Sequence, residues 1–160
     1  ATSCRLRGGR EVVLLKDKIN YKFKGGSGGY RPHQDLYYSL KEDRTSGKLE
    51  QVRMLEDWEA NVCMIAVDEM TVSNGCPHLA PKMHSKGWLQ YDDMLSAPLK
   101  NIRVEDKKTK DSMQWKSVEI PRGGVLIYGN MMPHMSEANK SNKNRRALFP
   151  IYCDKESVGV

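Results

Sequence analysis

The stretch Tyr30-Arg31-Pro32-His33-Gln34-Asp35-Leu36-Tyr37-Tyr38 places an imidazole and a carboxylate two positions apart in a segment rich in strand-forming residues. Side chains alternate between the two faces of a β-strand, so His33 and Asp35 are predicted to point to one side and Gln34 to the other. A His-x-Asp pair joined by a distant second histidine forms the 2-His-1-carboxylate triad, which leaves open positions on ferrous iron. Alone, so short a motif is a weak signal, and its value depends on the sequence around it.

Short apolar segments separated by turn residues follow one another along the chain. Strands are expected at 11–23 (one or two strands), 31–38, 61–68, 76–80, 115–120, 125–128, 131–136 and 147–152. The glycine-rich segment 25–29 is predicted to be a hairpin loop, because it has neither the lysine of a phosphate-binding loop nor a helix after it. This series of short strands with almost no amphipathic helix favours an all-β sandwich or barrel, and the jelly roll is a natural candidate.

Two polar stretches interrupt this pattern of strands. Residues 39–58 are consistent with a loop or a short helix over the surface. Residues 90–111 are long, charged and irregular, and such an insertion is either a lid over a substrate or a solvated loop without function. The expected architecture is a β-core with short helices and long loops, in a single domain over residues 1–160.

The composition is that of a globular protein with a moderate positive charge. A hydrophobic content of 39% in 160 residues favours one domain with a real core. The net charge of +6 permits an anionic ligand, but the basic residues are mixed with 20 acidic ones, so a solvated surface is the simpler interpretation. No nucleic-acid-binding motif, membrane span, signal peptide or peroxisomal Ser-Lys-Leu terminus is found. The expectation is a soluble cytoplasmic protein without nucleic-acid or membrane partners, of undetermined oligomeric state.

The cysteines are even in number but widely spaced, and they are predicted to be reduced thiols. They are Cys4, Cys63, Cys76 and Cys153. Cys76 also begins an alternative metal set with His78 and His84. The spacing Cys-x-His-x5-His has no fourth ligand nearby and does not match that of structural zinc sites, which makes this alternative weak.

A second group of functional side chains lies near the C-terminus. His134 is the only histidine after the long polar stretch, Ser136 follows two residues later, and Arg145 begins the last strand. A strand, a turn of about eight residues and a returning strand would bring these side chains into one interior. The planar guanidinium of an interior arginine fits a carboxylate through two parallel hydrogen bonds. The spacing therefore predicts an iron site beside the carboxylate of a co-substrate.

Five segments together are similar to the phytanoyl-CoA dioxygenase family of Fe(II)/2-oxoglutarate-dependent oxygenases. They follow the family's order within residues 11–153 and lie at 16–22 (KDKINYK), 32–36 (PHQDL), 73–76 (SNGC), 81–87 (PKMHSKG) and 134–147. The resemblance implies a double-stranded β-helix of the cupin-like jelly-roll type. It also implies that His33, Asp35 and His134 hold the iron, and that 2-oxoglutarate chelates this iron through its keto-acid end. Arg145, helped by Ser136, would bind the far carboxylate of 2-oxoglutarate.

The same resemblance implies a reaction. O2 and 2-oxoglutarate would be consumed, a C–H bond of a small organic substrate hydroxylated, and succinate and CO2 released. Asp35 favours a hydroxylase, because related halogenases lack this carboxylate and place chloride there. An acyl-CoA, a small amino acid or alkaloid-like compound and a phosphonate all remain open as substrates, with a slight preference for an anion. Relatives usually carry a helical portion before the His-x-Asp strand, so the expected domain lacks it, and a non-catalytic jelly-roll binding module with a vestigial metal pocket is the alternative function.

Several further side chains have two interpretations. Lys18, Asn20 and Lys22 share one strand face, which either reaches the pocket or lies exposed on the sheet. Met64 takes a position where some relatives present an aromatic ring to the pocket. Four other large side chains are candidates for a substrate-binding wall, with ordinary packing the simpler interpretation: Tyr37, Tyr38, Trp88 and Met131. For Arg145, the alternative is a surface basic cluster with the neighbouring lysines and arginine: Lys140, Lys143 and Arg146.

Overall fold

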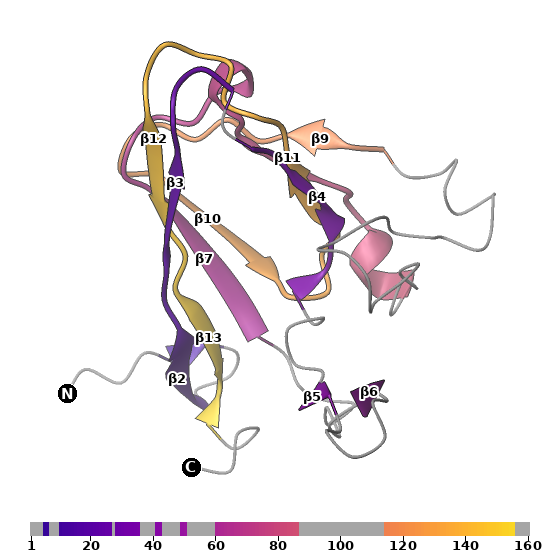
Figure 1. Cartoon of the computed structure of the whole chain (residues 1–160). Helices are drawn as coiled ribbons and strands as arrows, with labels where there is room; N and C mark the ends of the chain where they lie inside the picture. The colour runs from indigo at the N-terminus through magenta and orange to yellow at the C-terminus, as the bar shows by residue number, and fades with distance from the viewer. Residues whose placement is uncertain are drawn as a thin grey trace.

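A computed structural model of the chain describes residues 5–6, 10–26, 28–35, 41–42, 49–50, 60–86 and 114–155. Two β-sheets face each other across the described part of the chain (Figure 1). The larger sheet contains β1 (Arg5–Leu6), β2 (Arg10–Lys16), β3 (Ile19–Lys22), β7 (Ala60–Ala66), β10 (Val125–Gly129), β12 (Arg145–Leu148) and β13 (Ile151–Asp154). The smaller sheet contains β4 (Tyr30–His33), β8 (Pro77–Leu79), β9 (Lys116–Ser117) and β11 (His134–Ser136). This arrangement is the predicted all-β double-stranded β-helix.

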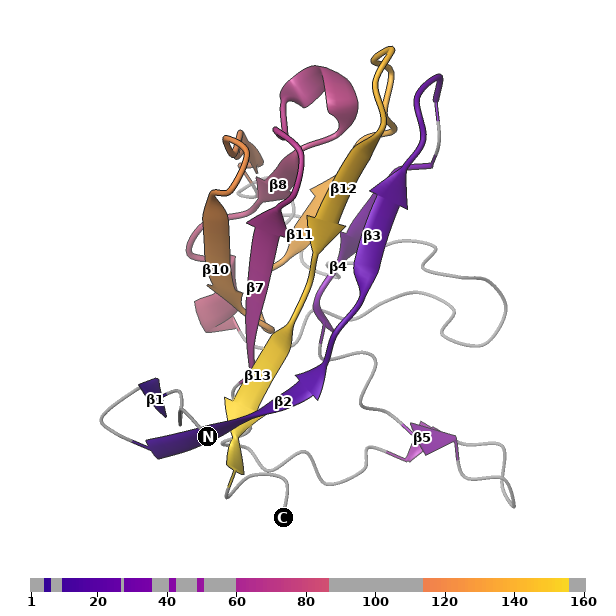
Figure 2. The same cartoon turned by 90° about the vertical axis from the view of Figure 1, so that its left-hand side faces the viewer.

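Strand β7 forms the centre of the larger sheet. One edge of β7 pairs with β10, and its other edge pairs with β13 near its start and with β12 near its end. Strands β12 and β13 therefore form one line that is interrupted around Pro150, which has no N–H to donate to a neighbouring strand. Figure 2 shows β3 beside β12, and farther down β2 pairs with β13, both in antiparallel fashion. The backbone at Lys18, between β2 and β3, accepts a hydrogen bond from the Phe149 N–H at 2.9 Å.

The alternation of β7 explains how the core lies between the sheets. The strand runs Ala-Asn-Val-Cys-Met-Ile-Ala, and every second residue from Ala60 to Ala66 is buried while those between are partly exposed. The inward face thus consists of small and medium apolar side chains, as expected for a strand that packs against a second layer. The buried apolar cluster is made of Val62, Met64, Ala66, Met70, Cys76, Ile120, Tyr128, Ala147 and Phe149.

The hairpin predicted at segment 25–29 is wrong. Strand β3 pairs with β12 and β4 pairs with β11, so the glycine-rich segment 25–29 crosses from one sheet to the other. Gly25 and Gly26 turn the chain there with φ angles of 80° and 100°, which favour glycine. Segment 137–144 makes the same kind of crossing between β11 and β12. His134 and Ser136 on β11 and Arg145 on β12 therefore share one interior, as predicted, but from opposite sheets.

Several predicted strands are also shorter than expected. The segment 31–38 ends as a strand at His33, 131–136 is a strand only from His134, and 147–152 is broken between β12 and β13. Segment 115–120 contains β9 and an isolated bridge between Met70 and Ile120. Short 3-10 helices lie at Val72–Asn74 (η2) and Met83–Lys86 (η3).

The predicted loop or helix at 39–58 contains a two-stranded sheet of β5 (Lys41–Glu42) and β6 (Leu49–Glu50), so the helical alternative is wrong in those positions. Segment 90–111 lies outside the described residues, as does Cys4. Among the described residues, the other three cysteines form no disulfide with one another, in agreement with the prediction of reduced thiols. Within the ranges that the structure describes, no helix is long and apolar enough to cross a membrane.

Candidate metal centre and the pocket beside it

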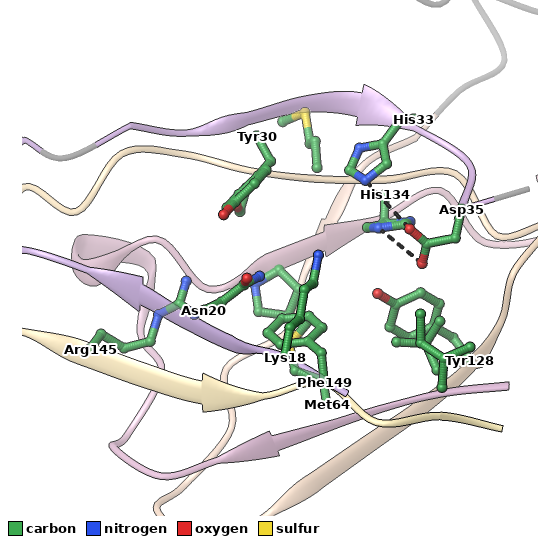
Figure 3. Close-up of a pocket in the computed structure, with 15 residues that line it drawn as sticks. Lys18, Asn20, Tyr30, His33, Asp35, Met64, Tyr128, His134, Arg145 and Phe149 are labelled. Atoms are coloured by element: carbon green, nitrogen blue, oxygen red, sulfur yellow. Dashed lines mark ion pairs between the residues drawn. The ribbon is translucent and has the colours of Figure 1, made fainter. Parts of the chain in front are cut away.

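The pairing of β4 with β11 creates the candidate metal centre. His33 lies directly opposite His134 in this antiparallel pair, and the centroids of the two imidazole rings are 4.1 Å apart. The strand ends at His33, and the Asp35 N–H donates to the Asn130 carbonyl at 3.0 Å. The carboxylate of Asp35 then lies between the histidines, with Oδ1 3.7 Å from His33 Nε2 and Oδ2 3.7 Å from His134 Nε2 (Figure 3).

Asp35 reaches this place by a different route from the predicted one. It lies in a turn after β4 and not on a continuous strand. Gln34 still faces away from the pair, where it is fully buried and its Nε2 donates to the Met131 carbonyl at 2.7 Å. This anchor fixes the turn, so the predicted opposition of His33 and Asp35 to Gln34 is confirmed although the extended strand is not.

The tautomer of His134 suits a metal ligand. Its Nδ1 lies 2.9 Å from the Met132 carbonyl oxygen, and a carbonyl oxygen only accepts hydrogen bonds. The proton of the neutral ring is therefore on Nδ1, which leaves a lone pair on Nε2 toward Asp35. A hydrogen bond from the ring nitrogen that does not bind the metal is the usual way in which proteins orient a ligating histidine.

The donor atoms fit a ferrous ion. One ligand atom from each of His33, Asp35 and His134 lies within 4.8 Å of the other two. Two imidazole nitrogens and one carboxylate oxygen are the donor set of non-haem Fe(II) oxygenases. Among the residues that the structure describes, no other group of three such side chains is gathered, so the alternative set of Cys76, His78 and His84 is not supported.

A pocket extends from this centre between the two sheets. The five residues predicted for the site line this pocket: His33, Asp35, His134, Ser136 and Arg145. Figure 3 shows the triad at one end, Arg145 and Asn20 at the other, and Lys18 with Phe149 between them. Met64 also lines the pocket, as do Lys18 and Asn20, so the inward interpretation of that strand face is confirmed for both. Of the four large candidates for a substrate-binding wall, only Met131 falls within the described residues, and it is not among those lining the pocket.

The consecutive arginines of β12 point to opposite faces. Arg145 is 3% exposed, and its Nη2 donates to the Gly75 carbonyl at 2.7 Å. Its Nε is buried and has no hydrogen-bond partner in the described part of the chain, and burial lowers the pKa of the guanidinium. Arg146 is outside and binds both Asp68 carboxylate oxygens at 2.8 Å, which lowers the pKa of that carboxyl to about 2. Arg145 is therefore an interior cation and not a member of a surface cluster.

Ser136 has an unexpected partner in Lys22. The Lys22 ammonium donates to Ser136 Oγ at 2.8 Å and also to the Glu137 carbonyl. Lys22 is only 2% exposed, so its side chain is buried behind the residues that line the pocket. Burial and the nearby Arg145 guanidinium lower the pKa of Lys22 to about 8.

Tyr128 is a pocket residue that sequence reasoning missed. It lies on β10 opposite Val62 of β7, and its ring centroid is 4.9 Å from that of His134. Its hydroxyl is buried without a hydrogen-bond partner among the described residues, and burial raises its pKa well above the ordinary value. A buried tyrosine hydroxyl usually finds a hydrogen-bond partner, and the lack of one is visible only in the structure and not in the sequence. Its hydroxyl is a donor directed at whatever the pocket binds.

Replacing Gly75 by alanine should lower the unfolding free energy of the protein. Gly75 has a φ angle of 79°, and a Cβ there would collide with the Glu137 carbonyl oxygen and lie 2.8 Å from Lys22 Nζ. Gly123→Ala is the matched control, because its φ angle is 80° but nothing lies within 4 Å of the added carbon. The control should lose about 1–2 kcal/mol of unfolding free energy. Gly75→Ala should lose about 1–3 kcal/mol more in urea denaturation, and equal losses would contradict the collision.

The comparisons with known proteins agree with this geometry. The family profile described as phytanoyl-CoA dioxygenase (PhyH) matches residues 6–147. The chain is 33% identical over 146 residues to a methylphosphonate hydroxylase of Gimesia maris, which covers 90% of this chain and 46% of the relative. It is 29% identical over 144 residues to a 2-aminoethylphosphonate dioxygenase of an uncultured bacterium, covering 90% and 47%. The chain thus spans about half the length of the curated relatives that it matches.

Solved structures share the fold. EvdO2 from Micromonospora carbonacea var. aurantiaca, complexed with 2-oxoglutarate, superposes with a TM-score of 0.64 at 17% identity over 89% of this chain and 52% of that one. The non-haem α-ketoglutarate-dependent carbocyclase SnoK from nogalamycin biosynthesis gives 0.65 at 19% identity, over 89% and 50%. The profile match over residues 6–147 and the shared fold lead to one conclusion: this chain belongs to the phytanoyl-CoA dioxygenase family.

Proposed function

We propose that this chain is the core of an Fe(II)- and 2-oxoglutarate-dependent hydroxylase that acts on a small anionic organic substrate. The observation that carries the proposal is the pocket itself, which has the His33, Asp35 and His134 triad at one end and the buried Arg145 at the other. This is the arrangement that a dicarboxylate would need if one end bound a metal and the other an arginine. Membership of the family and the fold shared with EvdO2 support the same function.

Different side chains would bind the metal and the co-substrate. His33, Asp35 and His134 would hold Fe(II), and Arg145 with Ser136 would hold the far carboxylate of 2-oxoglutarate. When bound, the iron supplies the activation of O2 that couples decarboxylation of 2-oxoglutarate to succinate and CO2 with hydroxylation of a C–H bond. The buried apolar wall of Val62, Met64 and Phe149 would exclude water from that chemistry.

We further propose that the substrate carries a phosphonate or a similar compact anion. Two relatives are named for phosphonates. In the pocket, Lys18 lies between the triad and Arg145 (Figure 3), and its Nζ is 5.5 Å from the Phe149 ring centroid. Among the described residues, no hydrogen-bond or ion-pair partner of the Lys18 ammonium is present, and burial lowers its pKa while the Asp35 carboxylate opposes that shift. An anionic substrate would supply the missing partner.

Replacing Lys18 by methionine should therefore raise the KM for the phosphonate substrate about tenfold or more. The 2-oxoglutarate that is consumed without substrate should change little, because Arg145 and Ser136 remain. Steady-state assays of succinate formation measure both quantities. Lys24→Met is the control, since Lys24 is exposed on the turn after β3. A variant that keeps the wild-type KM for every accepted substrate would remove Lys18 from substrate recognition.

The proposed function is tested by succinate formation from 2-oxoglutarate, with and without Fe(II), in the presence of methylphosphonate or 2-aminoethylphosphonate. Iron-dependent succinate that increases with one of these compounds is the expected result. Binding of Fe(II) and 2-oxoglutarate without any succinate would instead support the alternative of a non-catalytic binding module.

A further inference from the structure

We propose that Lys22 and Arg145 form a two-cation seat for the far carboxylate of 2-oxoglutarate, in which Lys22 acts by directing the hydroxyl of Ser136 at the ligand. This inference rests on the proposed function. It assigns to Lys22 a positioning role, because Lys22 lies behind the pocket wall and reaches the ligand through Ser136.

The first observation is the cross-strand register of β3 and β12. Lys22 lies directly opposite Arg145 in this antiparallel pair, and both side chains point inward, with exposures of 2% and 3%. Like charges directly opposite each other destabilise a sheet, and a buried cation is costly unless a counter-ion accompanies it. Within the part of the chain that the structure describes, neither side chain forms an ion pair. A pair of this kind calls for an anion that arrives from outside.

The groups around Lys22 do not provide that anion at contact distance. Arg145 faces it from β12, Tyr30 from β4, Cys76 from the turn before β8 and Glu137 from the segment after β11. The contact with Glu137 is through its backbone carbonyl, and burial raises the pKa of the Cys76 thiol, which keeps it neutral. The Tyr30 ring lies 5.6 Å from Lys22 Nζ and contributes only its π-face.

The direction of the hydrogen bond between Lys22 and Ser136 is fixed by chemistry. An ammonium group only donates, so Ser136 Oγ is the acceptor at 2.8 Å. The hydroxyl hydrogen of Ser136 is then turned away from Lys22, and Ser136 lines the pocket that Arg145 also lines. Ser136 is thereby held as a donor toward the pocket, and the positive charge behind it strengthens that donor.

The backbone at Gly75 accommodates the two neighbouring cations, Lys22 and Arg145. The Gly75 carbonyl accepts from Arg145 Nη2 at 2.7 Å, and a Cβ on Gly75 would lie only 2.8 Å from Lys22 Nζ. One glycine therefore contacts both cations and leaves room for the ammonium. The buried Arg145 Nε, which has no partner among the described residues, remains available to an anion.

The test compares two co-substrate acids that differ only at the far end. Fe(II)-loaded protein is titrated without oxygen with 2-oxoglutarate and with 2-oxopentanoate, which has a methyl group in place of the far carboxylate, and the visible absorption of the chelate is followed. Lys22→Met should weaken 2-oxoglutarate binding about tenfold and leave 2-oxopentanoate binding within twofold of wild type. In the double variant with Ser136→Ala, the two losses should be less than additive, because Lys22 acts through Ser136. Lys24→Met is the control and should change neither titration.

Each outcome decides between the proposals. Equal weakening of both acids, or no weakening of either, would overturn the role of Lys22. No chelate in the wild type would contradict the proposed function itself, which separates that failure from a failure of the inference. If Lys22→Met does not fold, the pH dependence of the wild-type protein provides the test. Its preference for 2-oxoglutarate over 2-oxopentanoate should fall as the pH rises through about 8, the value to which burial and Arg145 lower the pKa of Lys22. A preference that stays constant from pH 7 to about 9 would contradict the seat.

Discussion

Asp35→Ala should abolish Fe(II) binding and all turnover of 2-oxoglutarate. Asp35 is the carboxylate that faces both histidines, with one oxygen 3.7 Å from His33 Nε2 and the other 3.7 Å from His134 Nε2. Without it, two neutral imidazoles remain, and they offer neither the third ligand nor the negative charge that Fe(II) requires. We expect a loss of metal affinity of at least about 100-fold, since even indirect support of a ligand is worth about 10–100-fold.

Metal content after gel filtration and succinate formation measure the two effects. Asp68→Ala is the control, because Asp68 is a carboxylate that binds Arg146 on the outer face of β12. This control should keep its iron and lose at most about 1 kcal/mol of stability. An Asp35→Ala protein that retains stoichiometric iron and turns over 2-oxoglutarate would show that the metal is held elsewhere.

Arg145→Met should weaken 2-oxoglutarate binding by about 30-fold or more. Truncating one partner of a buried, hydrogen-bonded charge pair costs about 2–5 kcal/mol, and each 1.4 kcal/mol is tenfold in affinity. Arg145 is 3% exposed at the end of the pocket away from the triad, so its loss should leave the metal site intact. Iron content and 2-oxopentanoate binding should therefore be those of the wild type.

Arg146→Met is an unusually close control for this experiment. It removes the same side chain one position along the same strand, but from the outer face, where the guanidinium binds Asp68. Its only expected effect is the loss of a surface ion pair, worth less than about 1 kcal/mol. If both variants weakened 2-oxoglutarate equally, the binding of the far carboxylate could not be assigned to Arg145.

The fold was largely predictable because strand patterns are local. The alternating burial of β7 and the turn residues between short apolar segments both act over a few positions, and they gave the right class of structure. The partners of the strands were not local. The predicted hairpin at 25–29 was wrong because β3 and β4 pair with strands far along the chain, at β12 and β11. No pattern within segments 25–29 or 137–144 distinguishes a hairpin from a crossing between sheets.

The site was also predicted only in part, because some of its residues carry a local sequence pattern and others do not. His33, Asp35 and His134 carry recognisable spacing, and the turn that replaces the predicted strand still places Asp35 between the histidines. Lys22 and Tyr128 could not be assigned from sequence. The role of Lys22 depends on its register opposite Arg145, and that of Tyr128 on a hydroxyl without a partner among the described residues. Both are properties of long-range packing.

Anaerobic titration of the wild-type protein with Fe(II) and then 2-oxoglutarate tests the central proposal most directly. A weak visible charge-transfer band should develop and saturate, and His134→Ala should abolish it, because this variant removes the Nε2 ligand that Met132 orients through Nδ1. A wild-type protein that shows no band at saturating Fe(II) and 2-oxoglutarate, or a band that His134→Ala leaves unchanged, would contradict the assignment of the metal centre to these residues.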